Sequence, residues 1–202
     1  MGGYTMESDE ELIESANRQA RGRSPARAGV PSEREGPLTP EQAFEALYLR
    51  YRDWVYRLAW RFTGNREDAL DVLQETFAYL LGKFPGFELT AAMTTFLYPV
   101  VKHLAATARN KNGRFSSDIG VLGEIAAPES QAPGGSRGDL AAVLAALPED
   151  QREVVLMRFV DSMSLQEIAA ALDIPLGTVK SRLHNALNTL RTDRRTRDYF
   201  LE

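Results

Sequence analysis

A run of polar side chains near the carboxyl end of the chain has the residue types that bind nucleic acid. At about 100° per residue they fall on one side of a predicted helix that begins near Pro175. The members of this polar arc are Lys180, Ser181, His184, Asn185 and Asn188. Short hydrogen-bonding groups beside a cation can contact base edges and phosphates in a major groove. The solvated face of a protein-binding helix would have the same pattern, so both interpretations stay open.

Histidine is scarce and cysteine is absent in this chain. The two histidines, His103 and His184, lie far apart in the sequence, and there is no cysteine. Cysteine nucleophiles, thiolate metal sites and disulfides are therefore excluded. The sequence has no GxSxG, HExxH or glycine-rich phosphate loop. We predict no catalytic residue, no metal ligand and no cofactor.

The polar helix is the second helix of a predicted helix-turn-helix. Ser164 and Glu167 form a capping-box pattern that opens a short helix ending at Leu172. The connection "DIPLG" then leads into the longer helix. One arc of that helix is apolar and should pack against the first helix; it consists of Val179, Leu183, Ala186 and Leu190.

Upstream, three helical patterns with one apolar face each predict a small helical bundle. The first opens with Thr39, Pro40 and Gln42, which form a capping-box pattern with proline in the first turn. Breaks are expected at "TGN", residues 63–65, and at "GKFPGFE", residues 82–88.

The fold class expected from these elements is all-α, with two small helical domains joined by a flexible linker. Residues rich in Arg, Gly, Pro and Ser near the N-terminus, and a stretch without periodicity near the middle, have the composition of unfolded segments. The expected boundaries are a disordered N-terminal extension at 1–36, a bundle at 37–112, a flexible linker at 113–138 and a helix-turn-helix domain at 139–195. A short helix within residues 8–20 is the alternative for part of the extension.

The formal net charge of -4 argues mildly against a protein that binds nucleic acid unaided, because such domains usually carry a basic excess. No apolar run approaches the length of a membrane span, and the acidic N-terminus lacks the layout of a signal peptide. We therefore expect no membrane insertion and a cytoplasmic location.

Two long stretches resemble one protein family. "LPEDQREVVLMRFVDSMSLQEIAAALDIPLGTVKSRLHNALNTLR" resembles region four of the extracytoplasmic-function (ECF) subfamily of the sigma-70 family of bacterial RNA polymerase sigma factors. "EALYLRYRDWVYRLAWRFTGNREDALDVLQETFAYLLGKF" resembles their region two, in the expected order. The likeness covers about residues 38–192, and the pairing of "DVLQETF" with "LPEDQREV" and "GTVKSRL" makes it specific.

The resemblance implies a sigma factor that binds core RNA polymerase and directs promoter-specific initiation of transcription. Its partners would be core polymerase, promoter DNA and an anti-sigma factor, the usual regulator in the family. Two other interpretations stay open. One is a stand-alone helix-turn-helix regulator, and the other is a sigma-like adaptor that binds protein and no longer reads DNA.

The resemblance also assigns roles to particular residues in region two. Asp71, Gln74 and Glu75 match the surface that docks on core polymerase, with a solvated acidic face as the alternative. Seven residues match the minus-ten element surface, and they are Lys83, Phe84, Phe87, Tyr98, Lys102, His103 and Arg109. The loop aromatics among them would stack on an unstacked base, or they would be buried in the core.

In region four the resemblance assigns the minus-thirty-five element to the polar helix. The matching residues are Thr178, Lys180, Ser181, Arg182, His184 and Asn185. Five positions in the two regions depart from the family pattern, and they are Phe96, Pro99, Thr107, Asn185 and Leu187. Pro99 lies within a predicted helix, where it predicts a kink or a late helix start. Asn185 and Leu187 replace common arginines, so we expect weak affinity for DNA in the absence of polymerase.

Overall fold

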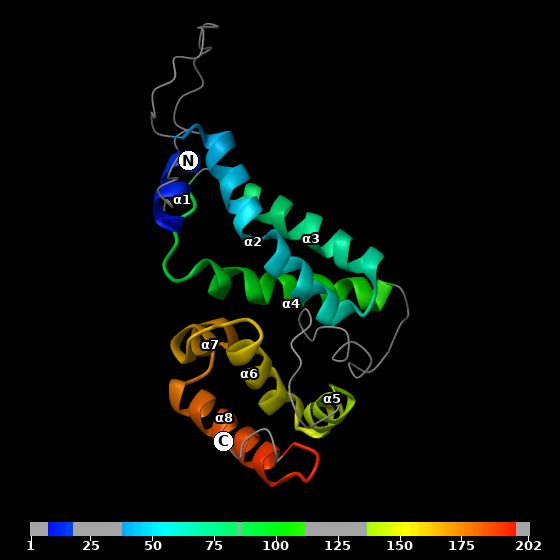
Figure 1. Cartoon of the computed structure of the whole chain (residues 1–202). Coiled ribbons are helices and arrows are strands. Elements are labelled where there is room, and N and C mark those ends of the chain that lie inside the picture. The colour runs from blue at the N-terminus through cyan, green and yellow to red at the C-terminus, as the bar shows by residue number, and fades with distance from the viewer. Residues whose placement is uncertain (1–7, 18–37, 85, 112–136, 197–202) are drawn as a thin grey trace, which may run out of the picture.

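The computed structural model describes residues 8–17, 38–84, 86–111 and 137–196, and within these residues every regular element is a helix. The eight helices are α1 (Asp9–Asn17), α2 (Pro40–Thr63), α3 (Arg66–Leu81), α4 (Met93–Lys111), α5 (Arg137–Ala146), α6 (Glu149–Phe159), α7 (Leu165–Leu172) and α8 (Leu176–Thr192). The all-α prediction is thereby confirmed. Figure 1 shows α1 to α4 as one group and α5 to α8 as the other. The predicted linker falls, up to residue 136, outside the described residues.

Helices α2, α3 and α4 form the predicted bundle, and local capping residues set their ends. The Thr39 side chain accepts from the backbone N–H of Gln42, and the Gln42 side chain accepts from the N–H of Thr39, so the predicted capping box is present. Gly64 ends α2 in the left-handed conformation, with φ of 73°. Asn65 then caps α3 by accepting from the N–H of Asp68. The turn at 63–65 therefore needs a glycine at position 64, to end α2, and an asparagine at position 65, to cap α3.

Helix α4 runs through Pro99, so a late helix start there does not occur. The helix begins at Met93, upstream of the proline, and continues to Lys111. Leu97 and Val101, on either side of Pro99, are fully buried in the bundle core. Their burial offsets the hydrogen bond that the proline cannot donate, because packing outweighs propensity in a protein helix.

The expectation of disorder across 1–36 does not hold for Asp9–Asn17, which form α1. Leu12, Ile13 and Ala16 are buried, and α1 packs against α2. Ser8 and Glu11 exchange side-chain to backbone hydrogen bonds of 2.7 and 3.3 Å, the reciprocal pattern of a capping box. A helix this short is stable only through such packing, which composition does not reveal. Residues 18–37 are not described.

The predicted helix-turn-helix is present in α7 and α8. The Ser164 and Glu167 capping box is confirmed, with hydrogen bonds of 2.6 and 3.2 Å. Asp173 ends α7 in the left-handed conformation. The buried residues of α8 are Val179, Ala186 and Leu190, as the apolar arc predicts, while Leu183 is half-buried.

The two helical groups share one hydrophobic core. Met157, Met163, Ile168 and Val179 belong to the same buried cluster as the residues of α2 to α4. Helix α7 lies against α4, as Figure 1 shows. A second, smaller cluster lies between α5, α6 and α8. The two sequence domains are therefore docked on each other in this structure rather than held apart.

Candidate functional surfaces

The outward face of α3 carries the three predicted polymerase-binding residues. Asp71, Gln74 and Glu75 are exposed, whereas Val72 and Phe77 beside them in the sequence are buried. The helix is anchored by its apolar side, so the carboxylates are presented to solvent from a rigid backbone. Such an arrangement suits a docking surface for a basic or amide-rich partner.

The predicted base-capture loop connects α3 to α4 and is rich in aromatic contacts. Phe84 is half-buried and makes edge-to-face contacts with Phe44 and Phe87, at centroid distances of 6.3 and 5.6 Å. Phe87 is 8% exposed and lies 4.8 Å from the ring of Phe96. Phe87 is thus a core residue in this conformation, and Phe84 is the loop aromatic that remains accessible. The ammonium of Lys83 lies 4.6 Å from the centroid of the Tyr79 ring.

Asn17, at the carboxyl end of α1, holds the backbone of this loop. Its Oδ1 accepts hydrogen bonds from the N–H of Gly86 at 2.8 Å and of Phe87 at 3.1 Å. Its Nδ2 donates to the carbonyl oxygen of Phe87 at 2.7 Å. Sequence analysis missed this residue; the short-helix alternative for residues 8–20 was the signal that could have placed it near the bundle.

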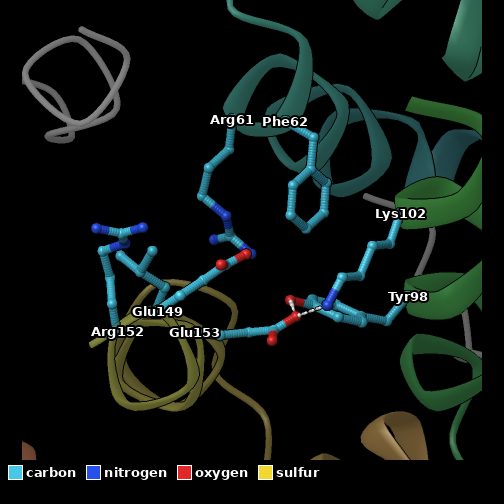
Figure 2. Close-up of a pocket in the computed structure, with 8 residues that line it drawn as sticks. Arg61, Phe62, Tyr98, Lys102, Glu149, Arg152 and Glu153 are labelled. Carbon is cyan, nitrogen blue, oxygen red and sulfur yellow. Dashed lines mark hydrogen bonds and ion pairs between the residues drawn. The ribbon is translucent and has the colours of Figure 1, made fainter. Parts of the chain in front are cut away.

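The predicted minus-ten residues of α4 separate into two groups. Tyr98 is 1% exposed and its hydroxyl donates to Glu153 Oε1 at 2.9 Å, and Lys102 Nζ lies 2.5 Å from the same oxygen. Figure 2 shows Tyr98 and Lys102 from α4 pointing toward Glu153 of α6. His103, by contrast, is exposed, and Arg109 is half-buried in the last turn. Half of this surface therefore faces the helix-turn-helix domain.

Burial and the Glu153 carboxylate act together on the Tyr98 hydroxyl. Removal from water disfavours the phenolate, and the nearby negative charge disfavours it further, so the pKa of Tyr98 is raised above its ordinary value. Tyr98 is therefore a neutral hydrogen-bond donor. Beside this contact lies a small, partly open pocket of about 50 Å³ lined by residues of α2, α4 and α6.

A buried ion pair links the two helical groups beside this contact. Arg61 of α2 donates through both terminal nitrogens to Asp161, at 3.1 and 2.7 Å, and the two residues are 6% and 8% exposed. Burial alone would lower the pKa of Arg61, but the charge and hydrogen bonds of Asp161 raise it. Arg61 is thus charged, and its bidentate geometry fixes the position of one group on the other.

The polar arc of α8 is presented to solvent as predicted. Lys180, Ser181, His184 and Asn185 are exposed, and His184 Nε2 lies 3.0 Å from the side-chain nitrogen of Asn188. The other two residues predicted to contact the minus-thirty-five element, Thr178 and Arg182, are only partly exposed. Thr178 is half-buried, and its carbonyl accepts from the Ser181 hydroxyl at 3.0 Å. Arg182 turns toward α6, where it pairs with Asp150 at 3.0 Å.

No cluster of three histidine, aspartate or glutamate side chains that could hold a metal ion occurs among the described residues. In the same part of the chain, no helix is both long enough and apolar enough to cross a membrane.

Family models match both halves of the chain. The model of Sigma-70 region 2 matches residues 47–115, and the model of Sigma-70, region 4 matches residues 137–190. The ECF RNA polymerase sigma factor SigW of Bacillus subtilis is 29% identical over 165 residues, which are 75% of this chain and 88% of SigW. The ECF RNA polymerase sigma-E factor of Escherichia coli K12 is 32% identical over 160 residues, 72% of this chain and 83% of the relative.

Solved structures support the same fold. CnrH in complex with the cytosolic domain of CnrY aligns with a TM-score of 0.57 at 18% identity, over 90% of this chain and 94% of that one. The sigma factor RpoE in complex with the anti-sigma factor NepR, from Bartonella quintana, aligns with a TM-score of 0.52 at 23% identity, over 75% and 98% of the two chains.

A helical bundle with an exposed acidic face, followed by a helix-turn-helix with an exposed polar arc, matches the two-region plan of the sigma-70 class. Within that class, the chain belongs to the ECF RNA polymerase sigma factors.

Proposed function

We propose that this sigma factor directs promoter-specific transcription through surfaces that lie on separate elements. Asp71, Gln74 and Glu75 of α3 bind core RNA polymerase. The loop at 83–87 and α4 contact the minus-ten element, and the polar arc of α8 contacts the minus-thirty-five element. The observation that carries this assignment is the exposure of Lys180, Ser181, His184 and Asn185 on a helix whose opposite side is buried.

The chain acts by binding and performs no chemistry of its own. Opening of base pairs costs a few kcal/mol for each unstacked step. Stacking of a displaced base on Phe84 and phosphate contacts to basic residues of region two offset that cost. The chain would act in the cytoplasm, where it meets polymerase and DNA. The chain also binds an anti-sigma factor, as the sigma factor RpoE of the same fold does in its complex with NepR.

Promoter binding by region two requires the helical groups to separate. Tyr98 is buried against Glu153 in this structure, so minus-ten DNA reaches the Tyr98 hydroxyl only after α6 has moved away. Lys102 is exposed, but its ammonium is paired with the same carboxylate. Polymerase supplies the binding energy for that change when it engages α3. Isolated affinity for DNA is accordingly low, which agrees with the net charge of -4.

Run-off transcription tests the function directly. The chain is mixed with core polymerase on fragmented genomic DNA, and the transcript starts are sequenced. The expected result is a set of starts that share upstream sequence at the minus-ten and minus-thirty-five positions. Absence of core binding would contradict the proposal. Specific duplex binding without polymerase would favour a stand-alone regulator, and core binding without specific starts would favour the adaptor.

A single substitution tests the role of α8. Lys180→Ala should weaken promoter binding by the holoenzyme and lower the slope of log affinity against log salt by about 0.9, because one phosphate contact is lost. Arg194→Ala, which removes an equal charge from an exposed residue beyond α8, is the control and should leave the slope unchanged. Binding is measured by anisotropy of labelled promoter DNA at several salt concentrations. An unchanged slope for Lys180→Ala would remove this residue from the interface.

A further inference from the structure

The N-terminal helix α1 is a fixed part of region two in this structure. Leu12 and Ile13 are 1% and 3% exposed and belong to the bundle core. At the N-terminal end of α1, the Asp9 carboxylate accepts hydrogen bonds from Arg50 and from the hydroxyl of Tyr51 in α2. Apolar burial and these polar contacts hold α1 against α2, so the position of Asn17 is determined by the bundle.

The position of Asn17 places its amide against the loop between α3 and α4. The side chain makes three hydrogen bonds to backbone groups 69 and 70 residues away. Gly86, one of the residues bonded, has φ of 95°, a left-handed conformation that only glycine adopts without strain. The two N–H groups and the carbonyl that Asn17 satisfies would otherwise depend on water. The amide therefore supports an unusual backbone conformation in this loop.

That conformation determines which aromatic ring of the loop is accessible. With the backbone of Phe87 held on both its N–H and its carbonyl, the Phe87 ring packs into the core against Phe96. Phe84 then lies half-exposed against Phe87 and Phe44. A shift of the Gly86 and Phe87 backbone would move both rings, because they contact each other.

We propose that Asn17 is a specificity-determining positioning residue for the minus-ten element. It holds Gly86 and Phe87 so that the loop keeps the shape into which a displaced promoter base fits, with Phe84 as the stacking ring. The inference rests on the proposed function of the loop. It makes the N-terminal segment a component of promoter recognition, through a residue that itself need not touch DNA.

The test compares base preference in variant holoenzymes. Wild-type chain, Asn17→Ala and Asn17→Asp are each assembled with core polymerase and assayed on a promoter identified by the run-off experiment, with all four bases at each minus-ten position. Asn17→Ala should flatten the preference at one position by roughly tenfold, as expected for the loss of orienting hydrogen bonds. Asn17→Asp keeps the acceptor for Gly86 and Phe87 and should give an intermediate loss. Glu10→Ala, on the exposed side of α1, is the control and should keep the wild-type preference.

Two further measurements separate positioning from loss of structure. Core affinity and the dependence on the minus-thirty-five sequence should not change in Asn17→Ala, while amide hydrogen exchange at Gly86 and Phe87 should accelerate. Should Asn17→Ala fail to fold, Asn17→Asp carries the test alone. An unchanged minus-ten preference in the variants overturns the inference. A wild-type chain without promoter-specific starts would instead refute the proposed function, so the two failures are distinguishable.

Discussion

Asp161→Ala should undock the helix-turn-helix domain from the bundle. The substitution leaves the Arg61 guanidinium, 6% exposed, without its bidentate partner. An uncompensated buried charge of this kind typically costs about 3–5 kcal/mol. The chain can relieve that cost by exposing Arg61 to water, and separation of the two helical groups does so. We therefore expect a larger radius of gyration by small-angle X-ray scattering and a lower urea midpoint for the docked state.

Matched variants separate the effect of the pair from a general loss of charge. Asp193→Ala removes the partner of Arg195 in an exposed ion pair and should leave both measurements unchanged. The double variant Arg61→Met, Asp161→Leu replaces the pair by apolar side chains and should dock again, since such replacements are often neutral or stabilising. Undocking should also expose Tyr98 and release Lys102 from Glu153. A radius of gyration and midpoint equal to wild type in Asp161→Ala would show that the pair does not hold the groups together.

Charge reversal on α3 should strongly weaken binding to core polymerase. The double variant Asp71→Lys, Glu75→Lys places two cations where the proposed docking surface has carboxylates. Close charge pairs at interfaces are coupled by about 1.5 kcal/mol or more, so two reversals should weaken binding by at least roughly a hundredfold. Both side chains are exposed and the apolar side of α3 is unaltered, so the fold should persist. The measurement is a titration of fluorescently labelled chain with core polymerase.

The control for this experiment alters the net charge by the same amount on another surface. The double variant Glu10→Lys, Glu45→Lys changes exposed residues of α1 and α2 and should retain wild-type affinity. Circular dichroism of all variants verifies that helix content is equal. Undiminished affinity in the α3 double variant would exclude Asp71 and Glu75 from the polymerase interface, whereas equal loss in the control would point to net charge rather than to a docking surface.

The amino-acid sequence by itself determined the bundle helices, the helix-turn-helix and the sides of α3 and α8 that face solvent. The capping boxes at Thr39 and Ser164 appear as predicted, because a cap depends on residues three positions apart. The polar arc of α8 and the carboxylates of α3 are exposed for a similar reason. Helical periodicity sorts side chains into a buried and an exposed side before any tertiary contact is known.

Only the tertiary structure decided which polar residues are buried and what the N-terminal segment does. Arg61 and Asp161 are 100 positions apart and form a buried ion pair. Neither residue has a local sequence pattern that would indicate this pairing. Tyr98 and Lys102 matched the minus-ten surface, yet both bind Glu153 of the other helical group in the docked arrangement, and Tyr98 is buried there. Asn17 lies at the end of a helix that would not be stable alone, and it bonds a loop 69 residues away. Local sequence patterns determine local structure. Pairing between distant polar groups depends instead on how the packed helices bring them together. The same packing determines which of the proposed promoter-binding residues are accessible.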